Sequence, residues 1–395
     1  MTDLRTLDIT VASRIYLPEP AAASFRLGAL ARALRDAGAA TTVLTTNPPP
    51  TYDEPLAGHD GITVRRARVL RDRAGYVRGY AQYMSFDIPL FFRLLLRRRP
   101  DVIVVEPPPT TGFFVRIASA ILRVPYVYYA ADIWSDAVHT TSAPGAIARI
   151  VRAVELWAMR GAAAVVCASE EFTGRLAELG VTGNVTTIGN GVDTTLFTPD
   201  GAARDLGAPY LLYAGTASEV HGATVFLDAF ARVLDEVPGS RLVFVGQGSE
   251  REELERRAAE LPAGSVVFEP RLAPRAVAEW IRGASATLAS VRPEGYHRAF
   301  PTKMYASVAC GTPVIYAGVG PGRDFAREPG LGAAVEYDVD AVAVAMIDAL
   351  AAPASAERRA GISAWAFAHV SLAAVAERAV AVISTVASTR RSRHG

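Results

Sequence analysis

Short apolar runs alternate with stretches of helical periodicity along most of the chain. In the first half, the runs that read as buried strands lie at 7–13, 41–46, 101–106, 125–130 and 163–169. Buried strands that alternate with helices form parallel sheets covered by helices on both faces. The pattern therefore predicts a doubly wound α/β domain.

The same alternation restarts near residue 210. Further strands are predicted at 210–215, 241–248, 265–270, 286–291, 313–318 and 332–337, with helices around 221–236 and 250–261. The stretch 189–209 is rich in Gly, Pro and Asp, which is typical of a linker. We predict two Rossmann-like domains, 1–190 and 191–374, with a C-terminal helix at 375–395 completing the first. The carboxyl ends of the strands are expected to face a central ligand cleft.

Composition and charge narrow the class of protein. The 395 residues are 50% hydrophobic and 21% charged, a globular profile, and the net charge of +1 gives no sign of a nucleic-acid partner. Cys167 and Cys310 lie in apolar runs without metal-ligand spacing, so buried, reduced thiols are expected. The N-terminus lacks the pattern of a signal peptide, and no uncharged apolar stretch of about 18 residues occurs. We expect a cytoplasmic protein.

One lysine stands among the 41 basic residues, and the other 40 are arginines. Lys303 follows Pro301 and Thr302, which is a plausible N-cap, in the first turn of a predicted helix that ends at Gly311. The helix dipole disfavours a cation at this end unless an anion also binds there. A compact ammonium suits a phosphate group, so Lys303 is predicted to bind a diphosphate. The alternative is an ordinary solvated lysine.

Several segments then resemble one family, in the right order. The segment "FPTKMYASVACGTPVI" (300–315) resembles the "P-S-K-x-x-E-Y-M-A-x-G-x-P-V-I" motif of family 4 glycosyltransferases, which have the GT-B fold. The segments "YYAADIWSDAV", "IGNGVDTTLFTP", "LLYAGTASEVHG" and "LVFVGQGSEREEL" also resemble family motifs. The resemblance covers residues 7–350. It is closest to the branch that builds bacterial cell-surface polysaccharides, such as the fucosamine transferases.

The resemblance implies a retaining, hexosyltransferase-type enzyme that needs neither a metal nor another cofactor. It would move a sugar from a nucleotide diphosphate sugar, with UDP the favoured carrier, to a glycan, a lipid-linked glycan or a small molecule. The C-terminal domain would bind the donor and the N-terminal domain the acceptor. A sugar-nucleotide epimerase or hydrolase on the same fold, and a non-catalytic GT-B subunit, remain alternatives.

The predicted donor site combines strand ends with the lysine segment. Its members are Gly215, Thr216, His221, Gly246, Gly248, Arg271, His297, Arg298, Phe300, Pro301, Thr302 and Lys303. Many family members carry two glutamates before the "G-x-P" segment, and here Arg298 and Ala306 occupy those positions. Glu294, nearby in the sequence, is a candidate to supply a catalytic carboxylate from a shifted loop.

The predicted acceptor site lies in the N-terminal domain. Asp132 and Trp134 follow a predicted strand, and Asp132 either orients the acceptor or caps a helix. Glu19, Ser24 and Arg26 belong to the opening loop and helix, although Arg26 fits an exposed helix face equally well. The segment "FFRLLLRRRP" (91–100) suits either contact with an anionic membrane or an amphipathic helix packed on the core.

Overall fold

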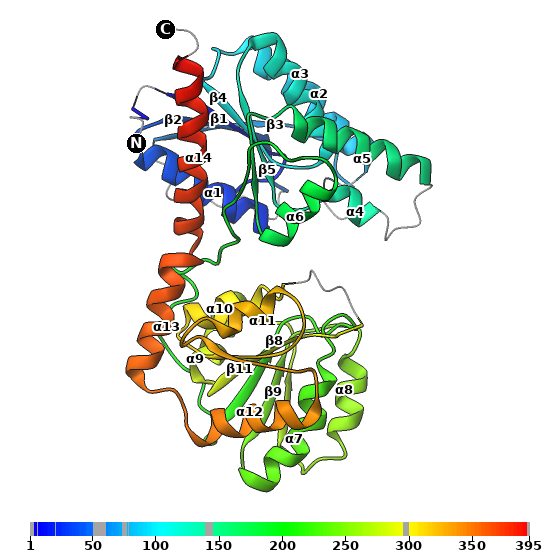
Figure 1. The fold of residues 1–395 in the computed structure, drawn as a ribbon, viewed down its shortest axis with the longest axis vertical. Helices are drawn as coiled ribbons and strands as arrows, with labels where there is room; N and C mark the ends of the chain where they lie inside the picture. The colour runs from blue at the N-terminus through cyan, green and yellow to red at the C-terminus, as the bar shows by residue number, and fades with distance from the viewer. Residues whose placement is uncertain are drawn as a thin grey trace. The chain divides into compact units, whose positions relative to one another are not determined.

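The computed structural model describes residues 4–5, 7–19, 21–49, 61–72, 77, 79–138, 145–294 and 300–392. The chain divides into two compact units (Figure 1). The first comprises 1–191 together with 372–395, and the second comprises 192–371. The boundary at Gly191 lies one residue from the sequence-predicted one, and the chain returns to the first unit at Leu372, three residues before the predicted helix.

The first unit is built on a parallel sheet with the strand order β3-β2-β1-β4-β5-β6-β7 over the described residues. Its strands are β1 (Asp8–Ala12), β2 (Ala40–Thr46), β3 (Ile62–Ala67), β4 (Val102–Val105), β5 (Tyr126–Ala130), β6 (Ala164–Cys167) and β7 (Val185–Thr187). The order reverses between β1 and β4. Crevices at such reversals, outside the carboxyl ends of the strands, are the usual ligand sites of open α/β sheets.

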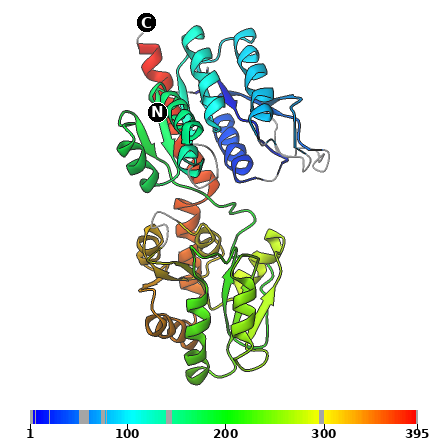
Figure 2. The same cartoon turned by 90° about the vertical axis from the view of Figure 1, so that its right-hand side faces the viewer.

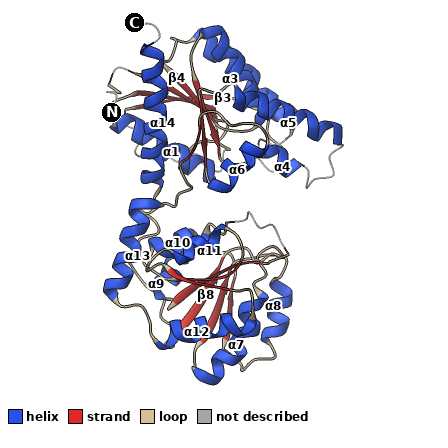
Figure 3. Cartoon of the chain, viewed as in Figure 1, coloured by secondary structure: helices blue, strands red, loops and turns tan. Residues whose placement is uncertain are grey.

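Helices cover both faces of this sheet, as Figure 3 shows. One face carries α1 (Ala22–Asp36) and α14 (Leu372–Ser392), which pack in a core that includes Val11, Val104 and Val127. The other face carries α2 (Tyr80–Leu96), α3 (Pro109–Leu122) and α5 (Gly145–Arg160) over Val105, Tyr126 and Tyr128. The short helices are α4 (Trp134–Val138) and α6 (Glu170–Glu178).

Helix α14 returns the end of the chain to the first unit. Val375, Ala379 and Ile383, spaced four residues apart along one face, belong to the same core as α1. The Arg378 guanidinium also donates to the Ile188 carbonyl at 2.7 Å. Among the described residues, α14 is long and apolar enough to span a membrane by length and composition alone. Its residues Val375, Ala379 and Ile383 instead pack in the core of the first unit.

The second unit contains a parallel sheet with the order β10-β9-β8-β11-β12-β13 over the described residues. Its strands are β8 (Tyr210–Ala214), β9 (Arg241–Val245), β10 (Val266–Glu269), β11 (Ala286–Val291), β12 (Val314–Gly318) and β13 (Gly332–Val335). Here the order reverses between β8 and β11. The carboxyl ends of these two strands therefore mark the expected ligand crevice.

The second sheet is also covered on both faces. Helices α7 (Thr224–Glu236) and α12 (Val339–Ala351) pack together in one core. The residues of α9 (Pro274–Gly283), α10 (Lys303–Ala309) and α13 (Ala356–His369) enter two separate cores. Helices α8 (Arg251–Ala258) and α11 (Pro321–Arg327) complete the unit. Figure 2 shows both units turned by 90°.

Each predicted strand is present; 286–291 has the predicted ends, and the others differ by one to three residues at one or both ends. Strands β3 and β7 were not predicted, because one is half polar and the other has only three residues. One further expectation was wrong. Thr302 precedes α10, but its side chain caps no backbone group. The Asp338 carboxylate does cap α12, where it accepts from the N–H groups of Asp340 and Ala341.

The structure also bears on the predictions for the two cysteines and for the segment 91–100. Cys167 and Cys310 are buried and free, as expected. In α2, Phe86, Leu90 and Leu94 pack in the core as one reading of this helix expected, whereas Phe92 and Leu96 are exposed, and the membrane reading of the segment stays a prediction. Helix α2 ends at Leu96, and the last arginines of the segment follow it as a loop.

Candidate functional site

A cavity of about 400 Å³ opens at the carboxyl ends of β8, β9 and β10 in the second unit. Its lining brings together residues from six separate segments of the sequence: Phe197, Ala214, Gly215, Thr216, Val245, Gly246, Gln247, Arg271, Leu272, Val277, Ile281, Lys303 and Ala306. The predicted donor residues Gly215, Thr216, Gly246, Arg271 and Lys303 are all members. The cavity is thus mostly apolar, with backbone and a few cationic groups at its edge.

Lys303 is the most unusual group in this cavity. Its Nζ atom is buried and has no hydrogen-bond partner among the residues that the structure describes. The ammonium lies 3.5 Å from the centroid of the Tyr213 ring, a cation–π contact from β8. Burial lowers the pKa of Lys303 to about 7. A buried amine without a carboxylate partner is unfavourable by itself and suits an anion supplied by a ligand.

Two glycines let the strand ends approach one another and the lysine. Gly246 has a φ of 139°, and a Cβ atom there would lie 2.2 Å from the Gly215 carbonyl oxygen. Gly215 has a φ of 136°, and its Cβ would lie 3.1 Å from Cε of Lys303. Only glycine adopts these dihedrals freely without a clash. The backbone of both loops is therefore open to a ligand that enters the cavity.

The loop after β8 carries His221, which lies close enough to Lys303 to feel its charge. Burial, with the Lys303 ammonium as a second cause, lowers the pKa of His221 to about 4. The ring Nδ1 lies 2.8 Å from the Ser218 hydroxyl, and the His221 carbonyl accepts from Ser290 at 2.6 Å. His221 is therefore neutral at pH 7. It does not line the cavity, so its place in the predicted donor site is peripheral.

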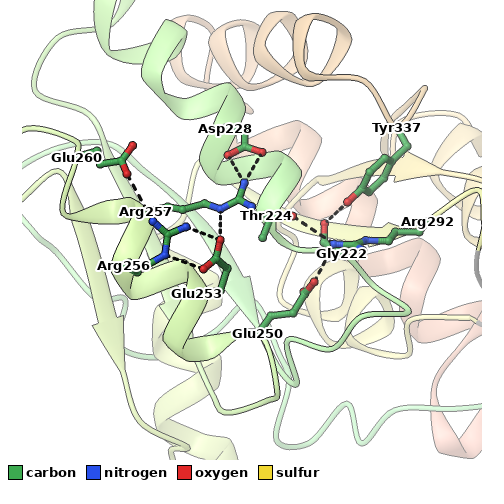
Figure 4. Close-up of polar contacts among 10 residues, drawn as sticks. All are labelled: Gly222, Thr224, Asp228, Glu250, Glu253, Arg256, Arg257, Glu260, Arg292 and Tyr337. Carbon is green, nitrogen blue, oxygen red and sulfur yellow. Dashed lines mark hydrogen bonds and ion pairs between the residues drawn. The ribbon is translucent and has the colours of Figure 1, made fainter.

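A buried polar network holds this loop (Figure 4). Glu250 accepts from the Ala223 N–H at 3.1 Å and from Arg292 at 2.9 Å. The Tyr337 hydroxyl donates to the Gly222 carbonyl at 2.7 Å. Charge-assisted bonds to a buried carboxylate are among the strongest in proteins. The network fixes residues 218–223 beside Lys303.

Five further residues in Figure 4 form exposed ion pairs outside the cavity. Arg256 and Arg257 of α8 both pair with Glu253 of the same helix. Arg256 also pairs with Glu260 just after the helix, and Arg257 also pairs with Asp228 of α7. Surface pairs of this kind contribute little to stability, typically about 0–1 kcal/mol.

Several predicted donor residues lie away from the cavity. Gly248 packs against the Ala217 backbone. Phe300 stacks on Tyr305, with ring centroids 4.7 Å apart, and Pro301 is buried at the start of α10. Thr302 and Glu294 are exposed and are not part of the lining. His297 and Arg298 lie outside the described residues.

A second cavity, of about 160 Å³, lies at the carboxyl ends of β1, β4 and β5 in the first unit. Its lining comprises Ser13, Arg14, Ile15, Ala22, Ala23, Arg26, Glu106, Pro107, Ala131, Asp132 and Trp134. The predicted acceptor residues Arg26, Asp132 and Trp134 are therefore brought together. The alternative position for Arg26, an exposed helix face, is wrong, because its side chain is only 10% exposed.

An ion pair forms the floor of this second cavity. Arg26 donates to Glu106, and their side chains are only 10% and 5% exposed. The Arg26 guanidinium also lies over the Tyr129 ring, 5.2 Å from its centroid. Partial burial raises the pKa of Asp132, although Arg26 opposes the rise. Asp132 itself remains accessible, so its carboxylate is available to a polar ligand.

Arg14 forms one wall of the second cavity. It donates to the Val77 carbonyl at 2.7 Å and lies over the rings of Tyr83 and Trp134. The Nε atoms of Arg14 and Arg26 are buried without partners among the described residues. Burial lowers the pKa of Arg14, against the pull of Glu106 and other acidic groups nearby.

The other acceptor candidates have structural roles. Glu19 pairs with Arg71 at 3.2 Å and is buried outside the cavity. Ser24 is fully buried on α1. Asp132 does not cap α4. Glu155 does, because its two carboxylate oxygens accept from the N–H groups of Trp134 and Ser135, at 2.9 Å each.

Sequence reasoning missed Arg14, Glu106, Tyr213 and Gln247. A usable signal existed for Glu106, since it is the polar residue that ends the apolar run at 101–106. No such signal exists for Tyr213. In a buried strand, the sequence pattern does not distinguish a ring that faces a ligand site from a ring that packs in the core.

With this geometry in place, comparisons with known proteins define the class. Residues 22–191 match the model of the "Glycosyl transferase 4-like domain", and residues 208–352 match that of "Glycosyl transferases group 1". The two matches fall one in each structural unit and together cover most of the chain. The chain therefore belongs to the family 4 glycosyltransferases with the GT-B fold.

Individual relatives agree with this assignment. A D-inositol 3-phosphate glycosyltransferase of Acidothermus cellulolyticus is 34% identical over 147 residues, which is 33% of this chain and 32% of that protein. A GDP-mannose-dependent alpha-(1-6)-phosphatidylinositol dimannoside mannosyltransferase of Mycobacterium tuberculosis is 30% identical over 53% of this chain and 56% of its own length. The matched segments thus span between a third and about half of these curated relatives.

Solved structures show the same fold at low identity. Sucrose-phosphate synthase from Thermosynechococcus elongatus aligns with a TM-score of 0.70 and 17% identity, over 97% of this chain and 100% of that one. Anabaena HepE in complex with UDP aligns with a TM-score of 0.67 and 16% identity, over 96% and 100%. The finer resemblance to transferases of cell-surface polysaccharides stays a prediction.

The buried amine of Lys303 leads to a prediction about how the stability of the protein depends on pH. Below pH 7 the folded protein must hold Lys303 charged, whereas its pKa in the unfolded chain is near 10.5. The unfolded state therefore binds more protons between these values, so this group makes stability rise with pH across that window. We expect Lys303→Met to raise the free energy of unfolding at pH 6.5 by about 1–3 kcal/mol. The gain should shrink towards pH 10.

Denaturant unfolding at pH 6.5 and pH 9.5 checks this. The matched control is Arg275→Met, which removes an exposed cation from α9 in the same unit and should change stability little at either pH. A Lys303→Met protein that is less stable than wild type at pH 6.5 would contradict the account of an uncompensated buried charge.

Proposed function

We propose that the protein is a retaining glycosyltransferase that moves a sugar from a nucleotide diphosphate sugar to a hydroxyl of a glycan, lipid-linked or small-molecule acceptor. The observation that carries this proposal is the buried, unpartnered amine of Lys303 beside a cavity of about 400 Å³ at the strand ends of the second unit. Family membership supports the reaction class. The acceptor and the sugar are left open.

The donor is assigned to the second unit. A diphosphate at Lys303 would supply the negative charge that the amine lacks, while the exposed backbone of Gly215 and Gly246 approaches the same place. The apolar part of the cavity, which includes Phe197, Leu272 and Ile281, suits a nucleoside. We place UDP first among the carriers, since a structural relative was solved with UDP, and GDP second, since one curated relative is named for GDP-mannose.

In the proposed reaction the bond between the anomeric carbon and the diphosphate oxygen breaks while a bond to the acceptor oxygen forms on the same face of the sugar. The leaving phosphate accepts the proton of the acceptor hydroxyl. Lys303 stabilises the negative charge that develops on the diphosphate, so no metal ion is required in this scheme. Asp132, in the first unit, orients the acceptor hydroxyl or steadies positive charge on the sugar ring.

Nucleotide titration tests the donor assignment. Calorimetry with UDP, GDP, ADP and dTDP should show selective binding of one of them. In Lys303→Ala the affinity for that nucleotide should be at least tenfold weaker, a loss of about 1.4 kcal/mol in binding free energy. Lys303→Arg should not restore affinity, because the larger guanidinium meets Tyr213 and Gly215 in a confined space. Arg275→Ala is the control. Binding that is indifferent to Lys303 would contradict the assignment.

Asp132→Asn tests the division of roles. This change keeps the shape of the side chain and removes its charge, so transfer should fall at least a hundredfold while nucleotide affinity stays within twofold of wild type. Product analysis with a panel of donors and acceptors, with and without EDTA, provides the readout. Loss of nucleotide affinity in Asp132→Asn, or full activity, would contradict this division. Activity that disappears with EDTA would contradict the metal-free scheme.

A further inference from the structure

Helices α2, α3 and α5 form one continuous outer layer of the first unit, and we call their outward side the three-helix face. Helix α3 packs against α2 on one side and α5 on the other, as Figures 1 and 2 show. Aromatic contacts run across all three helices, with ring centroids 5.2–6.1 Å apart. They link Phe92, Phe91, Phe114, Phe113 and Trp157 in that order.

Large apolar side chains protrude from this face into solvent. On α2 they are Ile88, Phe92 and Leu96, which are 44%, 52% and 85% exposed and stand four residues apart on one stripe. Helix α3 adds Ile121, and α5 adds Ile147, Ile150 and Trp157. Single exposed apolar residues are ordinary, but a set gathered on three adjacent helices marks an interaction surface.

Arginines outnumber acidic residues on the same face. The three helices and the loops that follow α2 and α3 carry the arginines at 93, 98, 99, 116, 123, 149, 152 and 160, while Arg97 is mostly buried and pairs with Asp8. The acidic residues of the three helices are Asp87 and Glu155, both fully buried, and the loop after α2 adds Asp101, which pairs with Arg390. Asp136 of the neighbouring helix α4 pairs with Arg152. Arg93, Arg99 and Arg160 donate to backbone carbonyls, which leaves their charge uncompensated.

We propose that the three-helix face is a docking surface for an anionic phospholipid bilayer. Exposed aromatic and aliphatic side chains insert at the level of the headgroups, while arginines around them bind lipid phosphates. Arg116 illustrates the arrangement, since its guanidinium lies 4.0 Å from the centroid of the Trp157 ring. The face lies in the first unit and is independent of the donor cavity in the second.

Charge complementarity favours a bilayer over a second copy of the chain. A symmetric dimer through this face would place arginines against arginines, since the helices α2, α3 and α5 carry no exposed carboxylate in their described residues. An anionic bilayer supplies negative charge across the whole surface. It also buries the exposed stripe without requiring a complementary shape.

Co-sedimentation with vesicles tests the proposal on the full-length protein. Vesicles of phosphatidylglycerol and phosphatidylcholine in equal parts should bind wild type at least tenfold more tightly than pure phosphatidylcholine vesicles. Raising NaCl from 0.05 to 0.5 M should weaken this binding at least fivefold, because salt screens exposed charges. Equal binding to the two kinds of vesicle, or none to either, would overturn the proposal.

Two variants separate the apolar and the charged contributions. Vesicle binding should fall at least fivefold in the double variant Phe92→Ser with Leu96→Ser. It should fall by at least as much in a second double variant, Arg98→Glu with Arg149→Glu. All four side chains are exposed, so melting temperatures should stay near that of wild type. The matched controls lie in the second unit: Phe367→Ser on α13, where Phe367 is 42% exposed, and Arg275→Glu on α9. Neither control should change binding.

Nucleotide affinity measured on the same variants keeps this result distinct from the proposed function, since it should be unchanged. Vesicle binding that survives both pairs of substitutions would overturn the assignment of this face. A dimer in light scattering that Phe92→Ser with Leu96→Ser dissociates, without vesicle binding by wild type, would assign the face to a second copy instead.

Discussion

A single uncompensated charge organises the second unit. The Lys303 amine is buried against the Tyr213 ring, and no carboxylate among the described residues accepts from it. A ring face offers much less than a carboxylate, so the amine gains its full stabilisation only when an anion enters the cavity. In the proposed function, this arrangement sacrifices stability in the empty protein for affinity towards the donor, a common feature of functional sites.

The surrounding architecture keeps that charge accessible to a ligand. Glycines at the ends of β8 and β9 bring two loops together: a Cβ at Gly246 would clash with the Gly215 carbonyl, and one at Gly215 would crowd the Lys303 side chain. The loop that carries His221 is held from behind by Glu250, Arg292 and Tyr337 rather than by groups inside the cavity. Because these polar groups satisfy one another, they leave Lys303 free for a ligand. In the proposed function that ligand is the diphosphate of the donor.

Much of the fold and of the cavity beside Lys303 was predictable from the sequence, for a simple physical reason. Parallel strands present their carboxyl ends at one edge, so the residues after 210–214 and 241–245 were bound to meet near the lysine segment. The contacts that depend on side-chain packing between distant segments were not predictable. The Arg26–Glu106 pair joins residues 80 positions apart, and α4 is capped by Glu155 rather than by Asp132, for which a cap was one of two readings. The short edge strands β3 and β7 also lacked a clear apolar pattern.

The most direct test of the central claim is proton uptake on nucleotide binding. The nucleoside diphosphate that binds is titrated calorimetrically at pH 8 in two buffers of different ionisation enthalpy, with its nucleoside as the control ligand. Because the pKa of Lys303 is about 7 in the empty site and that of His221 is about 4, the account predicts uptake of roughly 0.9 proton with the diphosphate and none with the nucleoside. Diphosphate binding at pH 8 without proton uptake would contradict it.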